Sequence, residues 1–340
     1  MPPFSPKYDR TPIRQVASLA KALNIDVGLL HDIARKSNGM YREVKEEKNG
    51  KIRITYDASS SLKGLHKRLK RHVLEHVIFP SYLNGSIKGR DYKLNAQAHA
   101  GAKIVICEDI SGFFPSINAN KVYDVWRYFF KFGEDVSVLL TELTTLNGFL
   151  PQGAITSPYL ANLVFWRDEF ELVTYFSNLG LIYTRFVDDM AVSSKTFIEP
   201  ETKTVIISKI IQMMRKNGCK INRKKHELLT AGKRMAVTKL TINQGVHLSK
   251  LEQRRIRAAV EQIVIQSNMV EILEVQEFLK LYLSVAGRVN HMSRFEPEKA
   301  KPLKVKLDMI KKKHIALLGS NKEKQKSAVH KPQSTCRDSI

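Results

Sequence analysis

The chain has 340 residues, 43% of them hydrophobic and 26% charged, which excludes global disorder and allows one large domain or two to three small ones. Its 56 Lys and Arg against 33 Asp and Glu give a net charge of +23, which indicates a polyanionic partner because bound phosphates release condensed counterions. A basic surface that only keeps the protein in solution explains this charge poorly, although an anionic membrane surface would also attract it.

The sequence shows no membrane-spanning segment, no signal peptide and no paired cysteine spacing. No stretch reaches the roughly 20 apolar residues of a membrane-spanning helix, and the start, MPPFSPKYDRTP, lacks the apolar core of a signal peptide. We therefore expect a cytoplasmic protein with no membrane partner. Cys107, Cys219 and Cys336 have no paired spacing, so we expect reduced thiols, with Cys107 in a core strand, and no zinc site or disulfide.

The N-terminal third of the chain combines helical and strand patterns. Apolar residues recur at helical spacing between residues 13 and 33, which predicts a small helical element. Residues 41 to 56 alternate around Asn49-Gly50, which predicts a β-hairpin. The segment 62 to 79 has an apolar helical stripe with Lys and Arg on its other faces, where they could meet phosphates. Taken alone, such a run is better explained as a solvated charged face.

The rest of the chain reads as a mixed α/β region followed by helices. The polar residues after about Leu318 are expected to be disordered. The elements predicted in chain order are a strand at 103 to 107, amphipathic helices between about 118 and 146, a Gly/Pro loop at 148 to 153, a helix from about 156 to 179, a hairpin around Val187-Asp188-Asp189, a helix at 200 to 217, short strands at 226 to 229 and 235 to 242, and helices from Lys250 to about Leu318.

Three aspartates stand at predicted strand ends. Asp109 follows the apolar strand KIVIC, and Asp188-Asp189 lies in the turn of a hairpin with apolar strands on both sides. A single such Asp is usually an N-cap or turn residue, and an acidic pair is usually a solvated tip. Here the flanking strands place the tip in the core, where adjacent carboxylates repel unless a cation joins them. Phosphoryl transfer uses two metal ions about 3.5–4 Å apart, and hard oxygen ligands select Mg²⁺.

Three motifs resemble those of reverse transcriptases. VICEDISGFFPSI resembles their first acidic motif, LPQGAITSPYLAN (150 to 162) their nucleotide-side loop and helix, and RFVDDM their aromatic-x-Asp-Asp hairpin. The order and spacing of the motifs also agree. The resemblance implies an α+β right-hand polymerase with fingers, palm and thumb, a ferredoxin-like palm sheet and a helical thumb.

Within that superfamily the chain most resembles the bacterial retron reverse transcriptases, over about residues 13 to 315. The similarity rests on the short helical N-terminus, on Asn95-Ala-Gln-Ala-His99, and on Val237-Thr238 followed by Asn243. The chain departs from the pattern at Phe186-Val187, where Tyr-Ala is common, and at Lys239, where Gly usually follows Val-Thr. The implied division is an N-terminal helical element at 1 to 40, fingers at 41 to 102, a palm at 103 to 243 with a fingers-side insertion at about 118 to 155, a thumb at 244 to 318 and a polar tail at 319 to 340.

The resemblance assigns Asp109, Asp188 and Asp189 to two Mg²⁺ ions, for which Mn²⁺ is a possible substitute. Arg53 would clamp the triphosphate, although it could also be an exposed strand charge. Phe114 would exclude a 2′-hydroxyl, although it could also be a plain core aromatic. The remaining implied residues are Gln152 and Gly153 at the incoming nucleotide, Lys225 near the leaving pyrophosphate with Lys224 able to exchange roles, and Asn95, His99, Arg254, Arg255 and Arg257 as weaker RNA contacts.

The resemblance also implies partners: dNTPs, a structured non-coding RNA that is both template and primer, its branched RNA–DNA product (msDNA), and a separate effector protein in anti-phage defence. The alternatives are another bacterial defence polymerase or a group II intron-like enzyme. An intron enzyme would ordinarily add a maturase segment, whereas only about 20 polar residues follow the predicted thumb. A non-catalytic RNA-binding scaffold is a minor alternative, because all three carboxylates are present.

Overall fold

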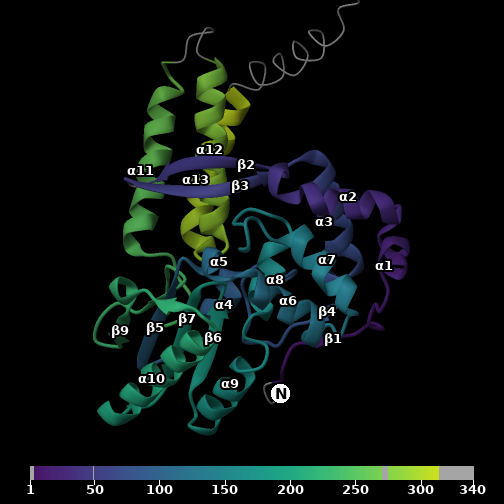
Figure 1. The fold of residues 1–340 in the computed structure, drawn as a ribbon. Helices are drawn as coiled ribbons and strands as arrows, with labels where there is room; N and C mark the ends of the chain where they lie inside the picture. Colours follow the sequence, from purple (N-terminus) through teal and green to yellow (C-terminus); the bar gives the residue numbers. More distant parts are fainter. Residues whose placement is uncertain (1–3, 49, 270–274, 314–340) are drawn as a thin grey trace, which may run out of the picture. The chain divides into compact units, whose positions relative to one another are not determined.

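The computed structural model describes residues 4–48, 50–269 and 275–313 (Figure 1). The chain separates into two compact units, Met1–Gly245 and Val246–Ile340. The predicted start of the thumb at residue 244 lies close to this division. The finer division of the first unit into an N-terminal element, fingers and palm stays a prediction.

The first unit begins with two short helices and a long hairpin. Asp26 caps the second helix by accepting a hydrogen bond from Leu29 N at 2.9 Å. The hairpin pairs antiparallel without a break, which confirms the predicted hairpin, although Asn49 in its turn lies outside the described residues. The elements are α1 (Val16–Leu23), α2 (Val27–Lys36), the 3₁₀ turn η1 (Ser37–Met40), β2 (Tyr41–Lys48) and β3 (Lys51–Ala58).

The basic helix α3 (Ser60–His72) is shorter than predicted. It buries Leu62, Leu65 and Leu69 on one face, as the apolar stripe indicated. The backbone leaves the helix at Val73 (φ −127°), so Val73 and Val77 of the predicted stripe lie beyond it. The chain continues through the 3₁₀ turn η2 (Leu74–His76) into β4 (Val77–Ile78), which pairs with β1 (Lys7–Tyr8).

A central antiparallel sheet organises the rest of the first unit. Its strand order is β6-β7-β5-β8, and β9 also pairs with β5. The order of elements along the chain, β5, helices, β6, β7, a helix and β9, is the β-α-β-β-α-β arrangement of a ferredoxin-like fold, as expected. The strands are β5 (Ile104–Ser111), β6 (Ile182–Phe186), β7 (Asp189–Ser194), β8 (Lys220–Ile221) and β9 (Glu227–Thr230).

Strand β5 is longer than the predicted KIVIC. Ile104, Val105 and Ile106 are buried, so the strand reads as a continuous apolar run. It continues to Ser111, so Asp109 lies within the strand and not beyond its end. Cys107 is half-buried in β5 and Cys219 is buried, and both thiols are free. Cys336 lies outside the described residues.

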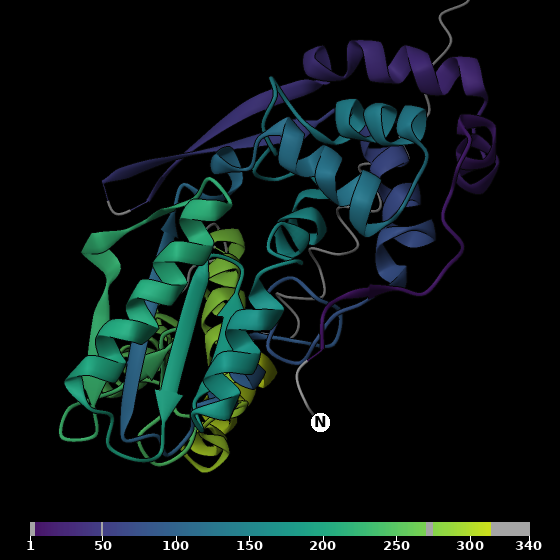
Figure 2. The same cartoon turned by 60° about the horizontal axis from the view of Figure 1, so that its bottom comes forward.

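Helices cover the sheet and fill the space beside it. The helices α9 (Glu169–Asn178) and α10 (Pro200–Lys216) lie side by side on one face of the sheet (Figure 2). Both helices bury apolar residues, including Phe176 and Ile210. The other helices of this part are α4 (Tyr92–Ala98), α5 (Phe113–Ser116), α6 (Ala119–Asp124), the π-helical turn η3 (Val125–Phe129), α7 (Glu134–Thr144) and α8 (Ser157–Leu163).

The single helix predicted from about 156 to 179 is broken into α8 and α9. At the end of α8, the carbonyl oxygen of Asn162 accepts a hydrogen bond from Arg185 Nη2 at 3.0 Å. A buried guanidinium thus binds a carbonyl at the helix end that has no backbone donor within the helix. Glu169, at the start of α9, binds the same arginine. The break therefore brings both helix ends to Arg185.

A small hairpin of β10 (Ala236–Val237) and β11 (Leu240–Thr241) is the last described pair of strands in the first unit. Its two turn residues, Thr238 and Lys239, have φ of 47° and 69°. Such left-handed backbone is uncommon outside glycine and is worst for β-branched side chains. The short strands predicted between 226 and 242 are confirmed.

The second unit is helical, as predicted from Lys250 onward. Ile256, Val289 and Leu307, one from each of its helices, are buried. The part of the prediction from 314 to 318, and the predicted tail, lie outside the described residues. Among the helices that are described, none has the length and apolarity needed to cross a membrane. The helices of the second unit are α11 (Lys250–Gln266), α12 (Val275–Ser293) and α13 (Pro297–Lys313).

Candidate active site

The three predicted aspartates lie together. Asp109 of β5 stands opposite Asp189, the first residue of β7, in the antiparallel register. Directly paired residues have Cβ atoms about 4.5–5.5 Å apart on one face of the sheet. Asp188 lies in the preceding turn, where its carbonyl accepts a hydrogen bond from Ile110 N at 3.1 Å. Asp109 and Asp189 therefore lie side by side on two adjacent strands, and Asp188 lies next to them in the turn before β7.

These carboxylates repel one another. Partial burial, followed by the charges of Asp188 and Asp109, raises the pKa of Asp189 from 3.8 to about 7. Burial and the charge of Asp109 also raise the pKa of Asp188. A cluster whose members resist ionisation is stabilised by any cation that enters it.

Lys225 supplies a positive charge to Asp109. Its Nζ donates to Asp109 Oδ2 at 2.5 Å, and Asn222 Nδ2 donates to Oδ1 at 2.9 Å. The 3₁₀ turn η4 (Arg223–Lys225) holds Lys225 here between β8 and β9. Burial acts to lower the pKa of Lys225, but the hydrogen bond and charge of Asp109 outweigh it and raise that pKa. Asn222 was not predicted, and no spacing in the sequence indicates it.

The turn that carries Asp188 is strained and tightly supported. Val187 has φ of 61°, unusual for a β-branched residue. A Cβ on Gly85 would lie 2.4 Å from Val187 N, so only glycine permits this close approach. The fully buried Arg185 donates to Val187 O at 3.0 Å and forms an ion pair with Glu169 (Nε to Oε1, 2.6 Å). An arginine inside the apolar strand LIYTRF was the one signal in the sequence for such a buried pair.

Two predicted nucleotide-binding residues contact each other. In the amide orientation that satisfies both groups, Gln152 Oε1 accepts hydrogen bonds from Arg53 Nε, at 3.0 Å, and from Arg53 Nη2. Tyr56 N donates to the backbone carbonyl of Gln152 at 2.8 Å. Gly153 has φ of 113°, and a Cβ there would lie 2.8 Å from Tyr56 O. The loop thus lies against β3, and glycine permits a close approach to Tyr56.

Phe114 stands in α5, after Gly112, whose φ is 56°. Its side chain is half-buried and packs against the core, with its ring centroid 5.9 Å from that of Phe113. This placement agrees with a core aromatic and leaves part of the ring accessible. The role of Phe114 in excluding a 2′-hydroxyl stays a prediction.

A cavity of about 370 Å³ adjoins the aspartates. Lys224, Lys225 and Lys239 contribute to its lining together with Asp109 and Asp189. The cavity therefore joins acidic groups, which suit cations, to basic groups, which suit phosphates.

The RNA contacts predicted at Asn95 and His99 fall on buried side chains. Both residues are 1% exposed. Asn95 Oδ1 accepts from Asn84 Nδ2 at 3.3 Å. Both ring nitrogens of His99 are engaged, by the hydroxyls of Ser193 and Thr184 at 2.7 Å, and burial lowers its pKa to about 4. The His99 ring thus binds β6 and β7, and we assign it no contact with RNA. Asn95 also lines the cavity beside the aspartates, so its contact with RNA stays a prediction.

The three arginines predicted in the second unit are exposed on α11. Arg255 lies 3.9 Å from Glu252, and Arg257 Nε donates to Gln253 O at 3.4 Å. Arg254 is also exposed, whereas Ile256 between them is buried. Their exposure agrees with the predicted contacts to RNA.

The donor set of the aspartates fits a hard divalent cation that shares its ligands with a substrate. Within residues 4–48, 50–269 and 275–313, no three His, Cys, Asp or Glu side chains are grouped closely enough to hold a metal by themselves. Mg²⁺ in proteins is typically bound by one or two carboxylates plus substrate phosphates and water. The neighbouring lysines could bind those phosphates.

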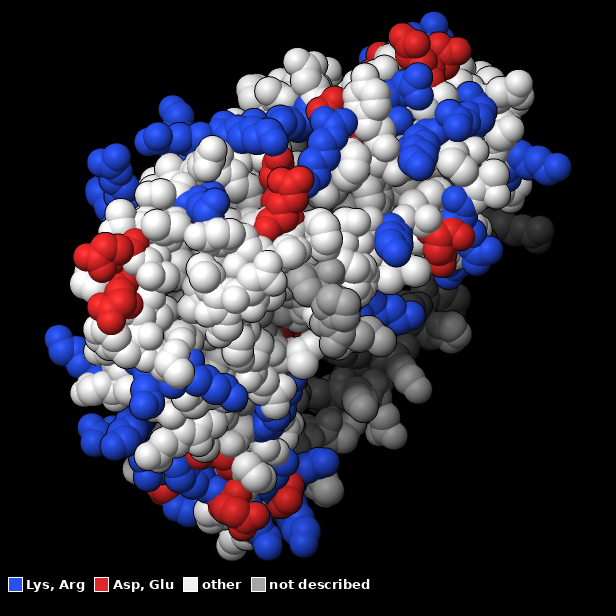
Figure 3. Space-filling model, turned by 90° about the horizontal axis from the view of Figure 1, so that it is seen from below, with Lys and Arg blue, Asp and Glu red and all other residues white. Residues whose placement is uncertain are grey.

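Basic side chains are spread over the face shown in Figure 3, whereas acidic side chains form a few separate patches. This distribution agrees with the net charge of +23 and with a polyanionic partner.

Comparison with known proteins agrees with the motifs. Residues 44–284 match the family described as reverse transcriptase (RNA-dependent DNA polymerase). The chain is 33% identical to the Retron Se72 reverse transcriptase of Salmonella heidelberg (strain 579083-10), over 90% of this chain and 82% of that protein. It is 31% identical to the Retron Ec48 reverse transcriptase of Escherichia coli, over 92% of this chain and 80% of that protein.

A solved apo telomerase from Candida tropicalis aligns with 82% of this chain and 58% of its own at 11% identity, with a TM-score of 0.47, which is too low to carry an inference. The family match extends over more than half of the chain, and the two retron relatives are similar over nearly all of it. The chain therefore belongs to the reverse transcriptases, a family of RNA-dependent DNA polymerases, and within them to the retron reverse transcriptases.

Proposed function

We propose that this enzyme copies part of a structured non-coding RNA into a branched RNA–DNA product, with Asp109, Asp188 and Asp189 as its catalytic carboxylates. The observation that supports these residues most strongly is the register of β5 and β7, which sets Asp109 opposite Asp189 beside the supported turn of Asp188. The contact of Lys225 with Asp109 supports a site for positive charge at the cluster.

Reverse transcriptases generally use divalent metal ions. We propose two Mg²⁺ ions at the three aspartates, replaceable by Mn²⁺. When bound, the ions would stabilise charge on the attacking and leaving oxygens of phosphoryl transfer. The carboxylates themselves fix where these charges are compensated, because the paired strands and the buried Arg185 hold them in place.

The incoming dNTP would be bound by residues of β3 and the adjacent loop. The guanidinium of Arg53 suits phosphate oxygens, and its bond to Gln152 holds the two side chains together. Gly153 keeps the loop against β3. Lys225 Nζ, beside Asp109, would meet the leaving pyrophosphate, with Lys224 in the same cavity. Phe114 would limit the space under the sugar.

The biological setting is also a proposal. We propose that the RNA serves as template and primer, and that a separate effector protein completes an anti-phage system. The support for both is the membership in the retron reverse transcriptases. We also propose the division into fingers (41 to 102), palm (103 to 243) and thumb (244 to 318).

Primer extension on a short RNA template with Mg²⁺ tests the activity. The wild-type protein should extend the primer with dNTPs, and Asp109→Asn should not. The control is Asp135→Asn, which changes an exposed aspartate of α7 and should leave extension intact. If the sequence of the DNA product is not complementary to the added template, a template-free polymerase would be indicated. If the protein binds RNA but makes no DNA with either Mg²⁺ or Mn²⁺, a non-catalytic scaffold would be indicated.

Sequencing the nucleic acid that co-purifies with the protein tests the partner. The expected result is one RNA species joined to complementary DNA. A mixture of unrelated cellular RNAs without attached DNA would contradict the retron part of the proposal.

A further inference from the structure

A second cavity, of about 450 Å³, lies between the C-terminal part of α10 and β8, within the first unit. Ile211, Met214 and Ile221 give it an apolar lining, together with the buried Cys219. Its polar lining comes from three exposed cationic residues, Arg215, Lys220 and Arg223.

The charges of this cavity are uncompensated. No Asp or Glu contributes to its lining. In the part of the chain that the structure describes, Arg215, Lys220 and Arg223 form no side-chain hydrogen bond or ion pair. Arg215 lies in the last turn of α10, where a cation complements the helix dipole. That explanation does not extend to Lys220 in β8 or to Arg223 in η4.

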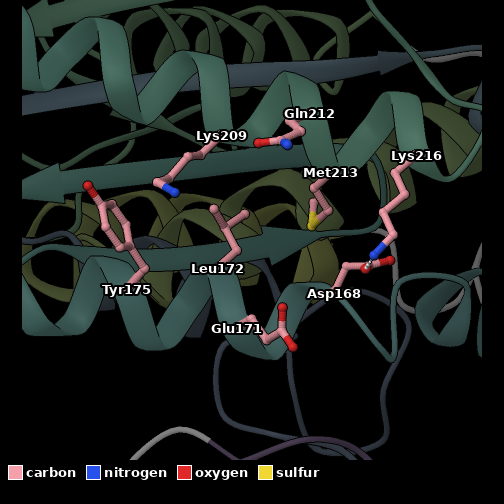
Figure 4. Close-up of a pocket in the computed structure, with 8 residues that line it drawn as sticks. All are labelled: Asp168, Glu171, Leu172, Tyr175, Lys209, Gln212, Met213 and Lys216. Atoms are coloured by element: carbon pink, nitrogen blue, oxygen red, sulfur yellow. Dashed lines mark hydrogen bonds and ion pairs between the residues drawn. The ribbon is translucent and has the colours of Figure 1, made fainter.

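A neighbouring hollow of about 220 Å³ between α9 and α10 shows the contrast (Figure 4). There Lys216 forms an ion pair with Asp168, and Lys209 Nζ lies 4.2 Å from the centre of the Tyr175 ring. The cations of that hollow already have protein partners. The cations between α10 and β8 lack them, so an anionic ligand from outside would compensate their charge.

The combination of an apolar lining and a cationic rim matches one nucleotide. A base buries apolar surface on Ile211, Met214 and Ile221, while the flanking phosphates meet Arg215, Lys220 and Arg223. The volume falls within the roughly 300–1,000 Å³ of ordinary ligand sites. Proteins recognise RNA largely through unpaired nucleotides whose bases are turned out of the stack. A paired base in a duplex is not available for such insertion.

We propose that this cavity binds an unpaired nucleotide of RNA together with its flanking phosphates, outside the polymerase centre. The inference rests on the proposed function only in taking RNA as the partner. Lys220 and Ile221 pair with Ser111 and Ile110 of β5, directly after Asp109. Arg223 shares the η4 turn with Lys225. A nucleotide bound here is therefore held at a fixed position relative to Asp109. It would fix the position of the RNA relative to the reaction centre.

Two variants test the proposal. The triple variant Arg215→Gln/Lys220→Gln/Arg223→Gln removes the charge. Ile211→Trp narrows the cavity from half-buried Ile211 without changing charge. The matched control is Lys103→Gln/Lys195→Gln/Lys233→Gln. It removes three exposed cations near the start of β5 and the ends of β7 and β9, at the end of the sheet away from the cavity. The probes are a fluorescent single-stranded oligouridine RNA and a blunt RNA duplex, and melting temperatures confirm folding.

The triple variant should bind oligouridine about ten- to fifty-fold more weakly near 0.15 M salt, and its salt slope should fall by about 2, since single strands lose about 0.7 per phosphate contact. Ile211→Trp should weaken oligouridine binding with an unchanged slope. Duplex binding should change little in either variant. Equal losses in the control triple, equal losses on the duplex, or wild-type affinity of Ile211→Trp would each overturn the proposal.

Primer extension separates this proposal from the polymerase assignment. The triple variant and Ile211→Trp should extend a short preformed primer-template at the wild-type rate, because the changed residues lie outside the aspartate cavity. Asp188→Asn should lose extension and keep its affinity for oligouridine. A wild-type protein that binds oligouridine as expected but extends no primer would refute the proposed function and leave this inference standing.

Discussion

Two tight turns of the first unit place residues other than glycine in left-handed backbone, and they differ in how they are held. Val187 (φ 61°) begins the acidic turn between β6 and β7, and Thr238 and Lys239 (φ 47° and 69°) form the basic turn between β10 and β11. The acidic turn is supported by buried groups, including the guanidinium of Arg185. The basic turn is held by one described side-chain bond, from Thr238 Oγ1 to Tyr92 O at 3.0 Å.

The difference shows two ways in which strain is tolerated beside a reaction centre. At the acidic turn, packing and a buried ion pair fix the backbone, so the carboxylates keep their positions despite mutual repulsion. At the basic turn, the flanking Val237 and Leu240 are buried, and Lys239 is exposed at the cavity. Buried groups thus hold the turn of the carboxylates, whereas the side chain of Lys239 is open to solvent.

The acidic turn should be indispensable for chemistry. We expect the double variant Asp188→Asn/Asp189→Asn to lose DNA synthesis by roughly 10³-fold or more, because metal-ion stabilisation is worth several kcal/mol and each ~1.4 kcal/mol is tenfold in rate. Single-turnover primer extension with Mg²⁺ measures this. RNA binding should stay near wild type, since side-chain volume is kept. Normal extension by the double variant would remove the carboxylates from the mechanism.

The buried support of the acidic turn should be the next largest effect. Glu169→Gln leaves Arg185 as an uncompensated buried charge, and breaking such a pair costs about 3–5 kcal/mol. Urea unfolding should show this loss of free energy of unfolding. The control is Arg185→Met/Glu169→Leu, which removes both charges and should lose less. If Glu169→Gln unfolds like the wild type, the ion pair is not what supports the turn.

The strain among the carboxylates should appear as a pH dependence in metal-free protein. Because the folded-state pKa of Asp189 is about 7 and its ordinary value is 3.8, the folded state binds a proton that the unfolded state lacks between those values. This group's contribution to stability is therefore complete below about pH 4 and is lost as pH rises through 7. Asp189→Asn should flatten the decline in urea unfolding with EDTA, and added Mg²⁺ should stabilise only the wild type at high pH. An identical pH profile for both proteins would contradict this.

The basic turn should show the smallest effect, with opposite signs for stability and function. Lys239→Gly relieves left-handed strain and should raise the free energy of unfolding by about 1 kcal/mol. It also removes a cation from the cavity, so the KM for primer-template should rise. Lys239→Gln is the control, since it removes the charge and keeps the strain. Greater stability with unchanged KM would mean that Lys239 has no part in binding.

The sequence predicted the parts of this site that depend on local patterns. The apolar strand before Asp109 and the apolar strands around Asp188 placed the carboxylates together, and Asn49-Gly50 predicted the long hairpin. It did not predict Gly85 or Asn222, because their contacts join residues far apart in the chain. The break between α8 and α9 was missed for the same reason: helical periodicity continues across it, and Arg185, which binds the end of α8, lies 23 residues further along the chain.

Burial also changed the interpretation of residues that motif resemblance had selected. His99 was predicted to contact RNA because the segment from Asn95 to His99 resembles the retron pattern. In the folded chain its ring bridges two hydroxyls within the sheet. A sequence pattern indicates that a polar residue matters, but only the fold shows which partner it has.

On one side, β5 pairs with two short strands, β8 and β9, and the two pairings leave Glu108 and Asp109 between them. β8 pairs with Ile110 and Ser111, β9 pairs with residues 104 to 107, and η4 spans the interval opposite Glu108 and Asp109. In this interval Asn222 N donates to Asp109 O at 2.8 Å and His226 Nδ1 lies 2.7 Å from Glu108 Oε1, so the η4 turn is held against β5 with Lys225 beside Asp109. We propose that Lys225 is an internal counter-ion of Asp109, whose place a divalent cation at the aspartates would take.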